Sequence, residues 1–263
     1  MNTTIKRAKA SHALMVWRLF WNVLYGVPIH LVHLPLYLLL SLTTRTKPAR
    51  LRLAAWALHL WQTGFAWLFG ITVEVEGQWP KGPMLVTPNH TGYLDVSALY
   101  SIGSMLFVAK SEIARWTFVG YLFRLTDQIG INRVLSVAEF RRVETRVKEA
   151  FDAGVKVCAF LEGTSTAGDQ VKPFHSPLVQ CAVDAGVPIL PVGLRWSISQ
   201  PGGIVSEDVA LHRLDQDPWK HWWRVTGLRG IHVKVRIGQP IYGTDRKTVA
   251  DQAHDQVSRL IKK

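Results

Sequence analysis

The pattern of hydrophobic and polar positions divides the chain into two parts. Up to about residue 71, long stretches carry no charge, whereas from Thr72 onward short apolar runs alternate with amphipathic segments. Short apolar runs bounded by turn residues are typical of strands, and longer segments with a 3.6-residue period are typical of helices. We therefore predict a membrane-associated helical region over residues 1–71 and an α/β domain over residues 72–263.

The second part is predicted to alternate strands and helices. The clearest helix, over residues 136–153, has Ser136 as its N-cap, Glu139 in the capping-box position and Gly154 just after its end. Strands separated by helices of this length predict an α/β fold with a largely parallel sheet flanked by helices, in which ligands bind at the carboxyl ends of the strands. The predicted strands are 72–77, 84–87, 105–109, 129–132, 156–161, 189–194 and 232–237. The predicted helices are 93–102, 111–125, 136–153, 177–186, 217–226 and 247–262.

The first part contains two apolar segments, residues 13–42 and 53–73, joined by a basic linker. Pro28 and Pro35 should kink the first segment. Two full membrane crossings would place the linker on the far side, against the positive-inside tendency. A shallow hairpin or a pair of interfacial helices would keep the linker and the following domain on the cytoplasmic face of the inner membrane, and we favour this arrangement. A soluble helical cap fits the long uncharged segments less well.

Charge is distributed unevenly along the chain. The net charge is +12, and no acidic residue precedes Glu74. The basic residues before it are interleaved with five of the eleven tryptophans, a combination suited to an anionic headgroup layer. Nucleic acid is the rival partner, but the charges flank apolar segments and form no solvated stripe, so we expect membrane lipids and no nucleic acid. Cys158 and Cys181 lie in apolar runs without metal-ligand spacing, which predicts core packing and no metal site.

The stretch Thr87–Asp95, with the sequence TPNHTGYLD, follows a predicted buried strand and precedes a predicted helix. A histidine and an aspartate five residues apart across such a turn can face the same cleft. His90 is then the proton acceptor, and Asp95 fixes its tautomer and stabilises the imidazolium. The same spacing recurs at His212 and Asp217, in a polar stretch without a preceding strand, and we interpret that pair as accidental.

Three further strand ends carry polar residues or prolines that packing does not require. They are the segments Ile129–Arg133, Glu162–Thr166 and Val187–Val192. Each has an ordinary explanation when taken alone: a surface charge at a helix start, a turn or cap residue, and prolines that mark a sheet edge.

Taken in order, these segments resemble the glycerolipid acyltransferase family, whose best-known members are the bacterial 1-acylglycerol-3-phosphate acyltransferases. That family carries an NH-x4-D block, an Ile-Asp-Arg-like block, a block similar to Phe-Pro-Glu-Gly-Thr-Arg and a block similar to Val-Pro-Ile-x-Pro-Val. The matching segments here are Asn89–Asp95, Ile131–Arg133, Phe160–Ser165 and Val187–Val192. The resemblance covers about residues 72–262 and implies catalytic roles for His90 and Asp95. The substrate-binding residues that it implies are Asn89, Lys110, Asn132, Arg133, Glu162, Gly163, Thr164, Ser165, Lys172 and Pro191.

The chain departs from the family pattern at several positions. Ser165 stands where many members that bind a phosphorylated acceptor have arginine, and serine cannot replace a bidentate phosphate ligand. Asn132 replaces the usual acid, Leu161 the usual proline, and His175 a common lysine. The segment EGTST, Glu162–Thr166, together with the Tyr-Leu-Asp ending of the first block, looks closer to the ornithine-lipid-forming branch, in which the acceptor is a lyso-aminolipid. Both a lyso-ornithine-type lipid and 1-acylglycerol-3-phosphate remain open as acceptors. The other cationic residues suited to an anion are Lys110, Arg133 and Lys172.

The resemblance implies direct acyl transfer from a thioester, acyl-CoA or acyl carrier protein, to a lipid hydroxyl, without a further cofactor. The chain has no Gly-x-Ser-x-Gly elbow, which agrees with a mechanism that forms no acyl-enzyme. Backbone N–H groups at a strand-to-helix turn would hold the oxyanion. Two alternatives remain: a hydrolase or transacylase that uses the same His/Asp pair, and a catalytically inactive lipid-binding or scaffold protein.

Overall fold

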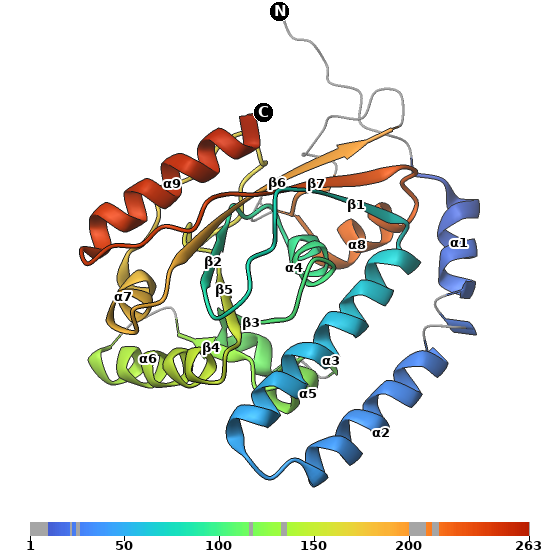
Figure 1. The fold of residues 1–263 in the computed structure, drawn as a ribbon. Coiled ribbons are helices and arrows are strands. Elements are labelled where there is room, and N and C mark those ends of the chain that lie inside the picture. The colour runs from blue at the N-terminus through green and yellow to red at the C-terminus, as the bar shows by residue number, and fades with distance from the viewer. Residues whose placement is uncertain are drawn as a thin grey trace, which may run out of the picture.

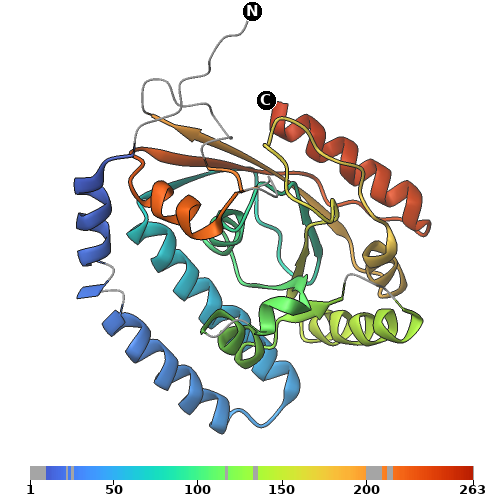
Figure 2. The same ribbon diagram turned by 180° about the vertical axis from the view of Figure 1, so that it is seen from behind.

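A computed structural model describes residues 10–21, 23–24, 27–115, 118–132, 136–199, 209–211 and 216–262. A seven-stranded sheet forms the centre, with helices on both of its faces (Figures 1 and 2). The strands are β1 (Ile71–Glu76), β2 (Leu85–Pro88), β3 (Met105–Lys110), β4 (Ile129–Ile131), β5 (Lys156–Ala159), β6 (Ile189–Ile198) and β7 (Ile231–Ile237). The helices are α1 (His12–Trp21), α2 (Val27–Thr43), α3 (Lys47–Leu68), α4 (Leu94–Tyr100), the 3₁₀-helix η2 (Ser111–Arg115), α5 (Phe118–Leu125), α6 (Val137–Asp152), α7 (Pro177–Asp184), α8 (Pro218–Thr226) and α9 (Arg246–Lys262).

The strand order is β1-β7-β6-β2-β5-β3-β4. All neighbouring strands pair in parallel except β6 and β7, which pair antiparallel over Val192–Ile198 and Ile231–Ile237. The largely parallel α/β sheet expected from the sequence is therefore confirmed. The carboxyl ends of β2 and β5 are neighbours at the centre of the sheet, and those of β3 and β4 lie at one edge.

The predicted elements agree with the observed ones apart from their ends and one helix. All seven predicted strands form, although β6 continues to Ile198, four residues beyond its predicted end. The single helix expected over residues 111–125 is wrong as one element, because Ser111–Arg115 forms a 3₁₀ turn. In α6 the predicted N-cap is confirmed, since the Ser136 hydroxyl accepts a hydrogen bond from the Glu139 N–H at 3.1 Å.

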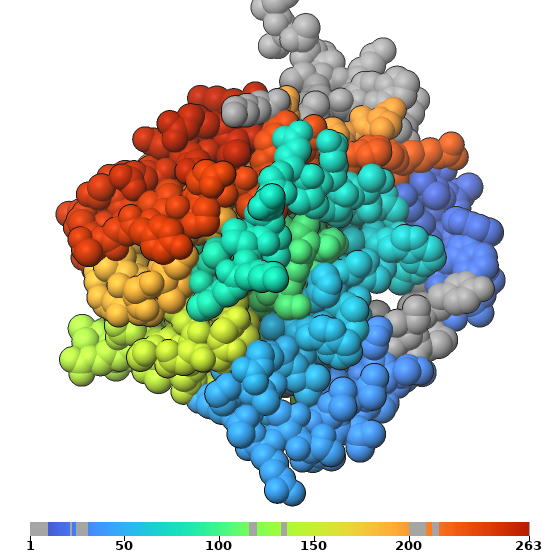
Figure 3. Space-filling model, viewed as in Figure 1, coloured from blue at the N-terminus to red at the C-terminus, as the bar shows by residue number. Residues whose placement is uncertain are grey.

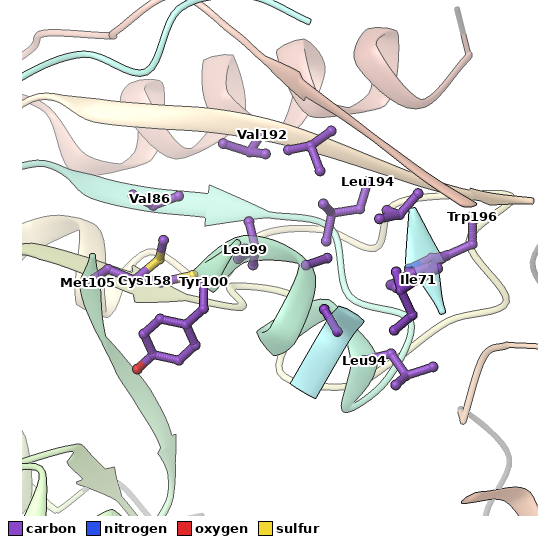
Figure 4. Close-up of a cluster of buried hydrophobic side chains, with 14 of the residues drawn as sticks. Ile71, Val86, Leu94, Leu99, Tyr100, Met105, Cys158, Val192, Leu194 and Trp196 are labelled. Carbon is purple, nitrogen blue, oxygen red and sulfur yellow. The ribbon is translucent and has the colours of Figure 1, made fainter. Parts of the chain in front are cut away.

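Two hydrophobic clusters, one on each face of the sheet, hold the layers together. One joins the sheet to α4 and α8, and the other joins it to α6, α7 and α9. Figure 4 shows part of the first cluster, in which Leu94, Leu99 and Tyr100 of α4 pack beneath the sheet together with Leu194 and Trp196 of β6. This packing fixes α4, and therefore the turn that leads into it.

The N-terminal helices differ in how far they join this core. Leu51, Ala54 and Leu58 of α3 are buried in the two clusters, so α3 shares its core with the sheet although it lies before the predicted boundary at residue 71. Helix α1 is tied to the end of α8 by the Arg18 guanidinium, which donates to the carbonyls of Thr226 and Leu228. Helices α2 and α3 lie together along one side of the molecule (Figure 3). No helix of the described ranges combines the length and the apolar character needed to cross a membrane.

Candidate active site

The turn between β2 and α4 carries the predicted catalytic pair. Strand β2 ends at Pro88, and α4 begins at Leu94, so His90 and Asp95 lie on the two sides of the turn. His90 Nδ1 lies 2.9 Å from Asp95 Oδ2. The Asp95 side chain is fully buried, whereas the His90 side chain is 23% exposed. The structure therefore brings the pair together with the imidazole open on one side.

Asp95 is surrounded by hydrogen-bond donors. Its Oδ2 accepts from the Thr91 N–H at 2.5 Å and from the Gly92 N–H at 2.9 Å, in addition to the His90 ring. Its Oδ1 accepts from the Thr91 hydroxyl and from Trp196 Nε1–H, both at 2.7 Å. A carboxylate accepts hydrogen bonds and donates none, so His90 carries its proton on Nδ1 and presents the Nε2 lone pair outward.

The side chain of the residue before His90 is bound to the sheet and does not face an open pocket. The fully buried Asn89 side chain donates to the Leu194 carbonyl at 3.1 Å and accepts from the Leu194 N–H at 2.7 Å. Both ends of its amide are therefore occupied by β6. The expected substrate contact through this side chain is corrected to a positioning role, because the amide holds the turn against the sheet.

Glu162 connects the turn after β5 to the same histidine. One carboxylate oxygen accepts from the His90 N–H and the other from the Lys172 N–H, each at 2.7 Å. The side chain is buried, and burial raises the pKa of the Glu162 carboxyl above its ordinary value, while the two backbone hydrogen bonds act in the opposite direction. With both oxygens bound to the backbone, Glu162 joins two turns instead of offering a free carboxylate to a ligand.

The remaining residues of the β5 turn lie beside His90. Gly163 adopts a left-handed backbone with φ of 65°, which explains the glycine at this position. Thr164 is exposed, and the Thr166 N–H donates to the His90 carbonyl at 2.8 Å. The Ser165 hydroxyl donates to the Leu211 carbonyl at 2.8 Å.

Leu211 also contacts the turn between β2 and α4. Its N–H donates to the Thr91 carbonyl at 2.9 Å, so the short described segment 209–211 joins the two turns. Gly92 permits this close approach, because a Cβ there would lie 3.0 Å from the Leu211 nitrogen.

Of the other predicted site residues, Lys172 contacts the site through its N–H bond to Glu162, and the rest lie on the sheet, just beyond β4 or outside the described ranges. Lys110 and Lys172 are exposed, and Lys110 aligns with Ile131 at the edge of the sheet. The exposed Asn132 accepts a hydrogen bond from the Ser111 hydroxyl. Pro191 is buried in β6, opposite Thr87, and is placed to pack within the sheet rather than to contact a ligand. Arg133 falls outside the residues that the structure describes.

Two aromatic residues of the site were missed by sequence reasoning. Phe160 stacks on the His90 ring with centroids 3.8 Å apart, and Trp196 donates to Asp95. Phe160 belongs to the third sequence block, but Trp196 follows the predicted end of its strand and carried no signal. In the rival pair, Asp217 caps α8 by accepting from the Trp219 and Lys220 N–H groups, and His212 lies outside the described residues.

The fold and the site define a class of protein: an α/β protein with a histidine oriented by a buried carboxylate at the carboxyl end of a largely parallel sheet. Comparison with known proteins gives the family. The model of the family described as Acyltransferase matches residues 70–195. The lyso-ornithine lipid O-acyltransferase of Pseudomonas aeruginosa is 30% identical over 212 residues, covering 80% of this chain and 78% of that protein.

Two other comparisons agree. The 1-acyl-sn-glycerol-3-phosphate acyltransferase of Neisseria meningitidis is 33% identical over 200 residues, covering 73% of this chain and 75% of that protein. The crystal structure of the 1-acyl-sn-glycerophosphate acyltransferase from Thermotoga maritima superposes with a TM-score of 0.68 at 18% identity, covering 95% of this chain and 94% of that one. The chain belongs to the acyltransferase family and is an O-acyltransferase.

Proposed function

We propose that this enzyme transfers a fatty acyl group from acyl-CoA or acyl carrier protein to the hydroxyl of a lyso-lipid in membrane lipid biosynthesis, without a further cofactor. The observation that carries the proposal is the 2.9 Å contact between His90 and a fully buried Asp95. A buried acceptor that is held by several donors orients the imidazole, and the exposed side of the ring is open to a substrate alcohol.

In the proposed reaction, His90 Nε2 takes the hydroxyl proton while the lipid oxygen attacks the thioester carbonyl carbon. The tetrahedral intermediate then expels the thiolate, which takes the proton back from His90. The His90, Thr91 and Gly92 N–H groups are bound by Glu162 and Asp95, so these three groups do not supply the oxyanion donors. We propose that backbone N–H groups of a neighbouring turn supply such donors, and the turn after β5, which contacts His90 through Thr166, is the candidate.

A single substitution tests the catalytic proposal. His90→Ala should lower acyl transfer from a radiolabelled thioester to a lyso-lipid by orders of magnitude. His254→Ala, on α9, is the matched control and should keep wild-type activity. Free fatty acid released by the wild type without any acylated acceptor would support the hydrolase. Full complementation of a deficient strain by His90→Ala would support the scaffold.

For the acceptor, we propose a lyso-ornithine-type lipid ahead of 1-acylglycerol-3-phosphate. The support is Ser165, whose neutral hydroxyl is bound to the Leu211 carbonyl, so this position offers no cation to a phosphate. The relative from Pseudomonas is named for a lyso-ornithine lipid, and the relative from Neisseria is named for 1-acyl-sn-glycerol-3-phosphate.

Competition between the two lyso-lipids tests this choice. The wild type should prefer the lyso-ornithine lipid, and Ser165→Arg should shift the ratio of kcat/KM values toward the phosphate-bearing acceptor. Ser165→Ala loses the same hydrogen bond without adding charge, and it should leave the ratio unchanged. A wild-type preference for 1-acylglycerol-3-phosphate would contradict the proposed acceptor.

We propose that α1 and α2 seat the enzyme on one face of a bilayer. Their exposed apolar side chains support the proposal, because monomeric soluble proteins rarely expose apolar patches of this extent. The exposed apolar residues of this region are Val16, Trp17, Leu19, Phe20, Val23, Leu24, Leu31, Val32, Leu36, Leu39 and Leu42.

Vesicle flotation tests this face. Leu39 is 60% exposed on α2, and Leu39→Glu should lower vesicle binding. Val137, 72% exposed at the start of α6, is the matched control, and Val137→Glu should bind as the wild type does. Equal binding by both variants would contradict the assigned face.

A further inference from the structure

Among the described residues, Trp196 is the one donor to Asp95 that comes from outside the Thr87–Asp95 segment. Its indole N–H lies 2.7 Å from Asp95 Oδ1, while the other donors belong to His90, Thr91 and Gly92. The indole is 1% exposed and therefore exchanges no hydrogen bond with solvent. This contact spans from the long strand β6 to the first turn of α4.

The same strand holds the other end of the motif. Leu194 and Trp196 are two residues apart on β6 and thus lie on the same face of the sheet. Leu194 binds the Asn89 amide through its backbone, and Trp196 binds Asp95 through its side chain. Strand β6 therefore holds Asn89 and Asp95, the residues at the two ends of the turn that carries His90. Figure 4 shows the Leu194 and Trp196 side chains in the cluster beneath the sheet.

We propose that Trp196 is a positioning residue that sets the orientation and charge distribution of the Asp95 carboxylate, and acts on His90 only through it. This inference rests on the proposed acyl transfer. The Thr91 hydroxyl can rotate, whereas the indole N–H has a single direction that is fixed by a buried ring. The indole thus fixes the position of Oδ1, and with it the direction of Oδ2 toward the His90 ring. A hydrogen bond to an ionised group is among the stronger ones in proteins.

The kinetic test is Trp196→Phe, which keeps a buried aromatic ring and removes the donor. We expect kcat to fall about 10-fold or more, with KM for both substrates changed by less than about 2-fold. Trp79→Phe, a partly buried tryptophan that packs on the same core cluster, is the matched control and should keep its kcat. In an Asp95→Asn background, Trp196→Phe should cause little further loss. An equal loss in both backgrounds would show a structural role and overturn the inference.

A measurement without substrates separates this inference from the proposed function. Diethyl pyrocarbonate acylates accessible neutral imidazoles, and peptide mass mapping resolves the rate at each histidine. Trp196→Phe should change the rate of modification at His90 and leave the rates at His175 and His254 unchanged, because Asp95 then no longer holds the His90 ring in the same orientation. An unchanged rate at His90 would overturn the inference. If the rate of His90 modification changes but the enzyme transfers no acyl group to any lyso-lipid, the positioning role of Trp196 is retained and the proposed function is rejected. Thermal unfolding of each variant identifies any loss of fold.

Discussion

Asp95→Asn is the sharpest perturbation of this site, because it keeps the size of the side chain and removes its charge. The five hydrogen bonds to Asp95 all require an acceptor. An asparagine can keep its oxygen toward His90, Thr91 N–H and Gly92 N–H, and it then turns its NH₂ group toward Trp196. The Thr91 hydroxyl can rotate to accept, but the indole N–H loses its partner. An unpaired buried donor costs about 1–3 kcal/mol of folding free energy.

The catalytic loss is expected to exceed this cost. As His90 takes a proton, its positive charge develops beside the Asp95 carboxylate. At a charge separation of about 4 Å and an effective dielectric constant of about 20, the attraction is about 4 kcal/mol. Losing it in the transition state lowers kcat about 10³-fold, since each 1.36 kcal/mol corresponds to about a factor of ten.

The assay measures kcat and KM for transfer of a radiolabelled acyl group to a lyso-lipid, with urea unfolding of the same preparations. Asp217→Asn is the matched control, because Asp217 caps α8 through N–H groups that an asparagine oxygen also binds. It should keep wild-type kcat. A folded Asp95→Asn enzyme with less than about a tenfold loss in kcat would refute the reasoning, since the carboxylate would then not stabilise the developing imidazolium.

Three further substitutions have defined outcomes. Gly163→Ala and Gly154→Ala both place a Cβ at positive φ, so each should cost about 1–2 kcal/mol in urea unfolding. Gly163→Ala alone should also lower acyl transfer, because its Cβ would lie 3.2 Å from the His175 ring at the site; equal activities would contradict this. Tyr37 donates to the Leu125 carbonyl, and burial raises the Tyr37 pKa to about 12, so the folded state keeps a proton that the unfolded state loses above pH 10. The stabilisation from the protonated Tyr37 is thus present below pH 10 and lost toward pH 12. Tyr37→Phe should lower the free energy of unfolding by about 1 kcal/mol at pH 9, and this difference from the wild type should shrink by about 1 kcal/mol by pH 11. A difference that stays constant with pH would contradict this assignment.

Local patterns predicted the elements and the catalytic pair. Apolar runs and turn residues placed the strands, and the capping box placed α6, because these signals depend on neighbouring residues only. His90 and Asp95 lie five residues apart across one turn, so their contact is also local. Over residues 111–125 the prediction of one helix was wrong, because Ser111–Arg115 forms a 3₁₀ turn.

The roles of Asn89 and Glu162 depended on contacts between distant residues. The sequence blocks showed that both belong to the site but left open what each side chain contacts. The partner of Asn89 is Leu194, 105 positions later, and one partner of Glu162 is the backbone of His90, 72 positions earlier. Strand pairing decides such contacts. An alternating pattern of apolar and polar residues predicts the face of the sheet on which a side chain lies, but it does not predict which strand lies beside it.

By itself, then, the sequence indicated an α/β acyltransferase and placed a histidine beside an aspartate at a strand end. Only the tertiary structure decided that β6 runs beside β2, and hence that Trp196 reaches a carboxylate 101 residues away. The physical reason is that a buried carboxylate must be surrounded by donors, and the identity of those donors depends on which strands and helices pack around it.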